Sequence, residues 1–248
     1  MSNTETDPDV RVCEHGAQQP PTQVDTYPPK DVPLGGEDAL RVRRTLPNMS
    51  RSFVGAWCFI DHYGPEEGAC MDVPPHPHTS LQTVSWLFSG EIEHRDSGGV
   101  HAMWRPGEVN LMTSGYGIAH SEVSTHNRAA LHGVQLWVVL PEESADLTRE
   151  FQHFVPDVDA PAPGVRARTF IGRLGDQGAP IHTETPLLGS EVVLEPGTTW
   201  ETAVDPGFEI VINPGTEALE HMGDFVRGMH EKSGLLPRIE QGVSVEEA

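Results

Sequence analysis

Short runs of β-forming residues alternate along the chain with turn residues. Residues 82–90 are rich in Thr, Val, Trp, Leu and Phe and end on glycine. Residues 131–140 form the most apolar run of the chain, which ends at Pro141. Between these runs, residues 91–96 precede a Ser-Gly-Gly sequence, as is typical of a strand that enters a hairpin turn. Many short strands separated by turns predict a sandwich, a jelly roll or a closed barrel.

A second β-rich region lies further along the chain. Residues 165–173, 190–194 and 208–213 have the composition of strands, with the turn sequences EPGTTW and DPG among them. A helix is predicted for residues 142–154, which connect the two regions. Pro141 stands at the start of this segment and acidic residues occupy its first turn, where they favour the helix dipole.

The two ends of the chain differ from these regions. The N-terminal residues are rich in Pro, Asp, Thr and Gln and offer few large apolar side chains, so we expect a flexible tail that is dispensable for folding. The pattern as a whole predicts five segments: a flexible, acidic and Pro-rich tail (1–36), an N-terminal β domain (37–141), a connecting helix or linker (142–164), a second β domain (165–215) and a polar C-terminal tail (216–248).

The charge balance and the cysteines restrict the class of protein. The chain has 16 basic and 37 acidic residues, a formal net charge of −21. Such a surface repels phosphate backbones and anionic membranes, so we expect no direct binding to nucleic acid or membrane. No run of about 18 apolar residues is present to span a bilayer. Cys13, Cys58 and Cys70 form no CxxC motif, and the N-terminus does not resemble a secretory signal. We therefore expect a cytoplasmic protein with reduced thiols.

The candidate chemistry lies in an H-P-H motif with His76 and His78 and an H-S-E motif with His120 and Glu122. In an extended strand residues i and i+2 point to the same face, so each motif presents two ligands to one ion. Three imidazoles and a carboxylate suit Fe, Mn, Co, Ni, Cu or Zn, and poorly suit Ca or Mg. They leave free coordination positions for water, dioxygen or an anionic oxygen ligand. The other histidines, His94 among them, are interpreted as structural, so replacing His94 should leave the metal bound.

Three stretches around these motifs resemble the pirin family of the cupin superfamily: DVPPHPHTSLQTVSWLFSGEIEHRDSGG, RPGEVNLMTSGYGIAHSE and LHGVQLWVVLP. The resemblance is continuous over about residues 40–141 and continues more weakly through APIHTETPLLGSEVVLEPGTTW. It implies an all-β fold, in which a cupin barrel (a double-stranded β-helix or jelly roll) precedes a second, shortened cupin-like β domain. The metal of the family lies in the N-terminal barrel. Its ligands fall on His76, His78, His120 and Glu122, and family members bind iron.

The chain departs from the family pattern at three places, of which residues 54–57 are interpreted as a packing variation. Gln82 stands where the general cupin motif often has glutamate, but in pirins the carboxylate comes from the position of Glu122. The C-terminal half is short, so we expect an incomplete second barrel whose open edge strands are covered by the C-terminal tail or by a second subunit. This region should hold no metal, because His182, His221 and His230 are isolated in the sequence.

The resemblance implies two functions, since some pirins are quercetin 2,3-dioxygenases and animal pirins act as transcriptional co-regulators. The first hypothesis is an iron-dependent dioxygenase of a flavonol or similar enolizable phenol, with O2 as co-substrate and Glu122 as the catalytic base. Phe53, Trp57, Phe59 and Met112 are expected in the pocket walls. The alternative is a non-catalytic, iron-binding and redox-responsive regulator that acts through a protein partner. A purely structural metal is a third interpretation.

Overall fold

The computed structural model describes residues 27–34, 40–66, 68, 70–125, 130–203, 226–227 and 238–240. Within these residues the chain divides into two compact units. The first contains residues 27–155 and 181–185, and the second contains the remaining described residues from 156 onward. Apart from one 3-10 turn, the described elements are strands, so the predicted all-β class is confirmed. The described part of the chain has no helix that is long and apolar enough to cross a membrane.

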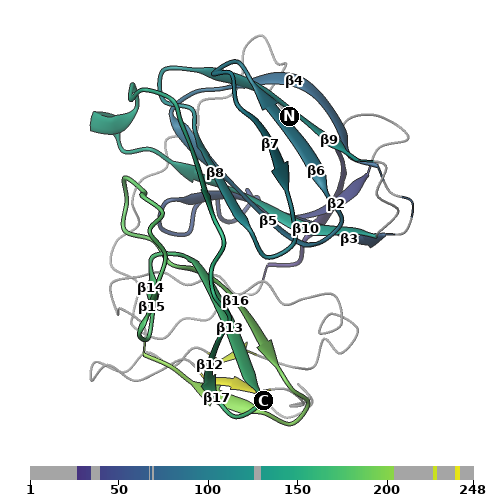
Figure 1. Cartoon of the computed structure of the whole chain (residues 1–248), viewed down its shortest axis with the longest axis vertical. Coiled ribbons are helices and arrows are strands. Elements are labelled where there is room, and N and C mark those ends of the chain that lie inside the picture. The colour runs from purple at the N-terminus through teal and green to yellow at the C-terminus, as the bar shows by residue number, and fades with distance from the viewer. Residues whose placement is uncertain are drawn as a thin grey trace. The chain divides into compact units, whose positions relative to one another are not determined.

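The first unit consists of two antiparallel sheets (Figure 1). The larger sheet has the strand order β1 (Lys30–Pro33), β2 (Arg41–Leu46), β3 (Trp57–Glu66), β10 (Leu131–Val139), β5 (Leu81–Ser89), β8 (Val109–Thr113) and β11 (Glu150–Phe154). The smaller sheet has the order β4 (Asp72–His78), β9 (Ile118–Ser124), β6 (Ile92–Asp96) and β7 (His101–Trp104). The strands predicted at residues 82–90, 91–96 and 131–140 are therefore confirmed as β5, β6 and β10.

Apolar side chains from both sheets form one core in the first unit. Its most deeply buried members include Val42 and Tyr63 from the larger sheet and Ile92 and Trp104 from the smaller one. These residues occupy alternate positions on strands whose intervening positions are more polar, which is the pattern of a sheet with one face buried. The core fixes the two sheets face to face and so positions the strands that carry the site.

The prediction of a flexible tail over residues 1–36 is wrong at its C-terminal end. Lys30–Pro33 form strand β1, which pairs with β2 so that Val32 lies opposite Val42. Val32 and Leu34 pack against the core. The two apolar residues have the i, i+2 spacing of a strand, and the edge of β2 supplies the hydrogen-bond partners that the isolated segment lacks.

The predicted helix at residues 142–154 is also absent. Only Glu142–Ser144 form a 3-10 turn, and no side chain caps its start. The chain then extends as β11 along β8, where Phe151 lies opposite Met112. The acidic start after Pro141 resembles a helix N-terminus, but the unpaired edge of β8 outweighs that local signal. The first unit therefore continues through residue 155, beyond the predicted boundary at residue 141.

The described residues of the second unit form three small sheets. They comprise β12 (Asp159–Ala162), β13 (Val165–Ile171) and β16 (Gly189–Leu194); β14 (Arg173–Leu174) and β15 (Gln177–Gly178); and β17 (Thr199–Glu201), β19 (Arg238–Glu240) and β18 (Val226–Arg227). The last two strands lie within the predicted C-terminal tail (216–248), where β19 pairs with β17. The strand predicted at residues 208–213 lies outside the described residues.

Candidate metal centre

Strands β4 and β9 carry the two predicted motifs and pair with each other. His76 lies directly opposite His120, and Val73 lies opposite Glu122. The register shifts between Val73 and His76, where two prolines of β4 face a single residue of β9. Proline has no N–H for the ladder and is tolerated at such a bulge, which changes the direction of the side chains that follow it. The sequence P-P-H-P-H thus determines how both histidines of β4 meet the face of β9.

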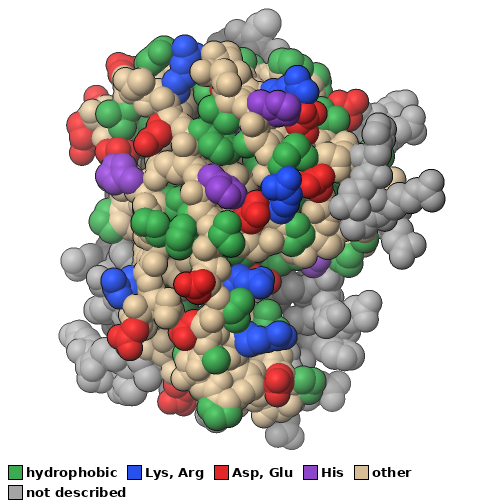
Figure 2. All heavy atoms as spheres, viewed as in Figure 1, with side chains coloured by type: hydrophobic (Ala, Val, Ile, Leu, Met, Phe, Trp, Pro, Cys, Tyr) green, Lys and Arg blue, Asp and Glu red, His purple; other side chains and the backbone are tan. Residues whose placement is uncertain are grey.

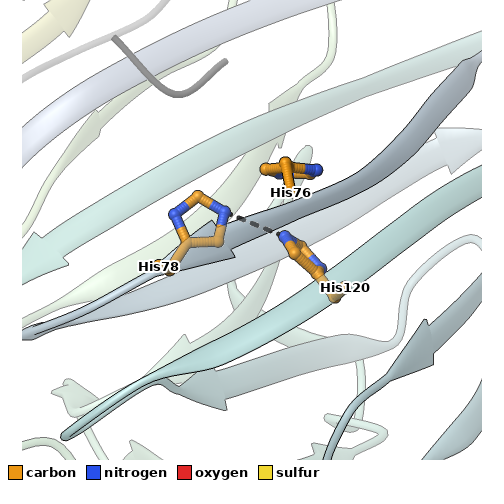
Figure 3. Close-up of side chains that lie close together, drawn as sticks. All are labelled: His76, His78 and His120. Carbon is orange, nitrogen blue, oxygen red and sulfur yellow. Dashed lines mark hydrogen bonds between the residues drawn. The ribbon is translucent and has the colours of Figure 1, made fainter. Parts of the chain in front are cut away.

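The three histidines turn their rings toward one another (Figure 3). One ligand nitrogen from each lies within 4.8 Å of the others, and Nε2 of His78 lies 2.9 Å from Nε2 of His120. Two nitrogens bound about 2.1 Å from one ion at right angles would be about 3.0 Å apart. The spacing therefore fits two ligands of one metal ion, and it is also the distance of a hydrogen bond between the two imidazoles. Imidazole nitrogens suit a first-row transition metal.

The third ring is oriented by the backbone. Nδ1 of His76 lies 3.0 Å from the carbonyl oxygen of Pro74, so it donates its proton there and Nε2 keeps a free lone pair. A backbone acceptor of this kind fixes the tautomer of metal-binding histidines in many proteins. His76 is therefore prepared to bind an ion through Nε2.

Burial keeps the histidines neutral. Desolvation, followed by the charge of neighbouring imidazoles, lowers the pKa of His78 to about 3 and that of His120 to about 2. Desolvation also lowers the pKa of His76, and the hydrogen bond to Pro74 opposes this effect. At neutral pH protons therefore do not compete with a metal ion for these nitrogens.

Glu122 lies beside the cluster. It is 5% exposed, and its Oε1 lies 3.6 Å from Nδ1 of His120 and 3.5 Å from the amide nitrogen of Gln135. Burial raises the pKa of its carboxyl to about 7. Glu122 is not among the residues whose ligand atoms lie within 4.8 Å of one another. The structure thus brings three of the four predicted ligands together and places the fourth next to them.

The histidine cluster and Glu122 line a cavity between the two sheets of the first unit. Its opposite wall carries Phe59 and Trp137, whose rings stack with centroids 4.0 Å apart. Arg44 covers the Phe59 ring and forms a two-point ion pair with buried Asp61, at 2.8 and 2.7 Å. The wall is therefore aromatic, and the Phe59 ring is held between Arg44 and Trp137.

Of the four wall residues expected from the sequence, only Phe59 is among the residues that line this cavity. Four polar or aromatic wall residues on β3 and β10 were not predicted from the sequence, namely Asp61, Tyr63, Gln135 and Trp137. A signal for them exists, because they continue the i, i+2 alternation of Phe59 along β3 and form a second such pair on β10. Which strand face meets the histidines follows only from the pairing of distant strands.

Comparison with known proteins agrees with this geometry. The profile of the family described as Pirin matches residues 39–138. A "Putative quercetin 2,3-dioxygenase" of Pseudomonas aeruginosa is 37% identical over 228 residues, which are 90% of this chain and 71% of that protein. A pirin-like protein of Caulobacter vibrioides is 38% identical over 170 residues, 64% of this chain and 59% of that protein. A crystal structure of a quercetin 2,3-dioxygenase from Acinetobacter baumannii superposes with a TM-score of 0.67 at 32% identity, over 73% of this chain and 60% of that one.

The fold and the site together define a cupin-fold protein with a candidate metal centre inside its first β unit. Within this class, the extent and identity of the match to the Pseudomonas protein, together with the family profile, are decisive. The chain belongs to the pirin family.

Proposed function

We propose that the chain is a pirin-type dioxygenase, in which iron held by His76, His78, His120 and Glu122 serves the oxidation of a flavonol-like, enolizable phenol by O2. The observation that carries the proposal is the buried histidine cluster, which faces an aromatic wall across one cavity. The names of the relatives from Pseudomonas and Acinetobacter support the substrate class. Other first-row metals fit the same imidazoles, so the choice of iron rests on the family.

The residues of the cavity would divide the work as follows. Bound iron would supply Lewis acidity toward the phenol oxygen and one-electron chemistry toward O2. A carboxylate oxygen of Glu122 would accept the phenol proton, and the Gln135 amide, 3.5 Å away, would orient that carboxylate. Phe59 and Trp137 would hold the planar ring by edge contacts, because Arg44 and Trp137 already cover the faces of the Phe59 ring. The Tyr63 hydroxyl, a buried donor with no hydrogen-bond partner among the described residues, is available to a polar group of the substrate.

The test combines elemental analysis of the purified protein with oxygen uptake across a panel of flavonols. We expect the wild type to bind one metal ion per chain and to consume O2 when loaded with iron. His76→Ala should purify with little metal, because it removes one of three clustered imidazoles. The control, His101→Ala, removes an exposed histidine on β7 and should keep both metal and activity. A fully loaded His76→Ala variant would show that the ligand assignment is wrong.

An iron-loaded wild type that oxidises none of the flavonols would favour the alternative, a redox-responsive regulator that acts through a protein partner. On the face drawn in Figure 2, the described Lys and Arg side chains are separated by acidic ones and form no basic patch. This arrangement and the net charge of −21 support a protein partner over a nucleic acid. We also propose a cytoplasmic location, in line with the free Cys58 and Cys70, and a second subunit that covers open strand edges of the second unit.

A further inference from the structure

A line of buried side chains leads from His120 away from the cavity and into the protein. Nδ1 of His120 lies 3.3 Å from Nδ1 of His94, and Nε2 of His94 lies 3.1 Å from Oδ2 of Asp96. The side chains of His94 and Asp96 are 0% and 1% exposed, and His120 is 1% exposed. Three polar groups buried this deeply need hydrogen-bond partners, and they supply them to one another.

The sheet holds these groups in place. Strand β6 pairs with β9 so that Asp96 lies opposite His120. The His94 ring lies between Trp104, at a centroid distance of 5.5 Å, and Phe151, at 5.1 Å. His94 therefore has little freedom to tilt away from His120. Phe151 belongs to β11, the strand that the sequence analysis predicts as helix.

The hydrogen bonds of Asp96 determine the direction of the whole chain of donors. Its Oδ1 accepts from the backbone N–H of Gly98 at 2.7 Å and of Val100 at 3.1 Å, which leaves Oδ2 for His94. A carboxylate only accepts, so Nε2 of His94 must donate to it. Nδ1 of His94 then carries a lone pair.

That lone pair determines the tautomer of His120. The two Nδ1 atoms lie 3.3 Å apart, and the one of His94 carries a lone pair. A hydrogen bond between them therefore requires that Nδ1–H of His120 donates to Nδ1 of His94. The nearest oxygen of Glu122 lies 3.6 Å from the same atom, beyond the usual range of a hydrogen bond. With its proton on Nδ1, His120 has a lone pair on Nε2, the atom that faces His78.

We propose that Asp96 and His94 are positioning residues, which fix His120 in the tautomer that presents the Nε2 lone pair to the metal. The inference rests on the proposed ligand role of His120. It changes the expectation for His94, whose replacement the sequence analysis expects to leave the metal bound. Partners of this kind raise metal affinity without touching the metal, and their loss typically costs about 10- to 100-fold in affinity.

One substitution should reverse the chain of donors. In Asp96→Asn the side-chain oxygen must stay at the Oδ1 position, because two backbone N–H groups donate to it. The NH2 group then faces His94 and donates to its Nε2, so that His94 carries its proton on Nδ1. Nδ1 of His120 must then accept a hydrogen bond from His94, so the proton of His120 moves to Nε2. A protonated Nε2 has no lone pair with which to bind the metal. The variant differs from the wild type only by an isosteric amide.

Two measurements test the proposal: 15N NMR of the imidazoles in the metal-free protein, and a titration with Co2+ as the probe. The signals of His120 are assigned by comparison with His120→Gln. We expect the Nδ1–H tautomer of His120 in the wild type and the Nε2–H tautomer in Asp96→Asn. Asp96→Asn should bind Co2+ about 10- to 100-fold more weakly than the wild type. The matched control is Glu93→Gln, which exchanges a carboxylate for an amide on the outer face of β6 and should change neither result.

The outcomes separate this inference from the proposed function. An Nε2–H tautomer of His120 in the metal-free wild type would overturn the inference without recourse to any variant. Wild-type affinity for Co2+ in a folded Asp96→Asn would overturn it as well. A wild type that shows the expected tautomer but binds no Co2+ would instead refute the ligand role of His120, and with it the proposed function.

Discussion

Replacing Glu122 with glutamine should stabilise the metal-free protein at alkaline pH. Burial raises the pKa of Glu122 from 4.5 to about 7. Between these values the folded protein holds a proton that the unfolded chain has released, so stability falls as the pH rises from 4.5 to about 7. The full loss is about 3 kcal/mol, since each unit of pKa difference corresponds to about 1.4 kcal/mol.

Glutamine cannot ionise and avoids this loss. We expect metal-free Glu122→Gln to gain about 3 kcal/mol relative to the wild type at pH 8, and about 1 kcal/mol at pH 5. Packing differences between the two side chains contribute equally at both pH values, so the change with pH isolates the charge. The assay is urea denaturation in the presence of a chelator at the two pH values.

Glu93 on β6 provides a control, because the pH dependence of its contribution to stability has the opposite sign. Hydrogen bonds to Arg95 and His101 lower the pKa of exposed Glu93, so its ionised form favours the folded state. Stability from this group is present at pH 8 and is lost as the pH falls through its folded pKa, so Glu93→Gln should be slightly less stable than wild type at pH 8. If the stability difference between Glu122→Gln and wild type is the same at pH 5 and pH 8, the reasoning about a buried, ionisable carboxyl is wrong.

In the iron-loaded protein, the same substitution should lower the proposed activity. Glu122→Gln should keep part of the iron, because three imidazoles remain and an amide oxygen still coordinates weakly. Turnover per bound iron should fall by about 100- to 10,000-fold, since an amide cannot accept the substrate proton. The measurement is oxygen uptake with quercetin, normalised to bound iron. Equal activity per iron in wild type and variant would eliminate Glu122 as the base.

Three further changes test the fold. Deleting residues 1–36 should lower the free energy of unfolding by about 2–4 kcal/mol relative to deleting residues 1–26, because Val32 of β1 and Leu34 just after it pack against the core. Equal urea midpoints of the two deletion variants would contradict this. Burial raises the pKa of the Cys58 thiol to about 11. In a variant whose third cysteine, Cys13, is replaced by serine, iodoacetamide at pH 8 should therefore alkylate exposed Cys70 at least about 10-fold faster than Cys58. Gly115→Ala should lower stability by at least about 1–3 kcal/mol by thermal denaturation, because φ is 49° and the added Cβ would overlap a backbone carbonyl oxygen.

The pattern of apolar and polar residues predicted those strands whose formation depends on their own sequence. The strands β5 and β10 follow from runs of β-forming residues, and His76, His78 and His120 meet because i, i+2 spacing places side chains on one face. The errors at β1 and β11 share one cause. Each is a short segment with few apolar residues that becomes a strand because an open sheet edge lies beside it. That edge is β2, the next strand along the chain, for β1 and the more distant β8 for β11.

The same limit applies to the site. Asp96 and His94 have the i, i+2 spacing of the ligand motifs, so spacing alone does not tell a ligand from a residue that supports one. The difference follows from register, since β6 pairs with the far edge of β9 and places His94 behind His120 instead of beside the cavity. Contacts of this kind depend on strand order, which one sequence does not reveal.

The position of Glu122 is compatible with the two roles proposed for it, ligand and base. The three histidines are held in one cluster by the pairing of β4 with β9 and by hydrogen bonds of the rings to Pro74 and His94. Glu122 lies on the same strand as His120 but outside that cluster, between His120 and Gln135 of the opposite sheet. To accept a proton, the carboxylate oxygen must not be bound to the metal. To act as a ligand, the same oxygen must be bound to it. Three imidazoles that hold the ion without the carboxylate allow Glu122 to occupy either position, and this is why Glu122→Gln should lose turnover before it loses iron, whereas His76→Ala should lose the iron itself.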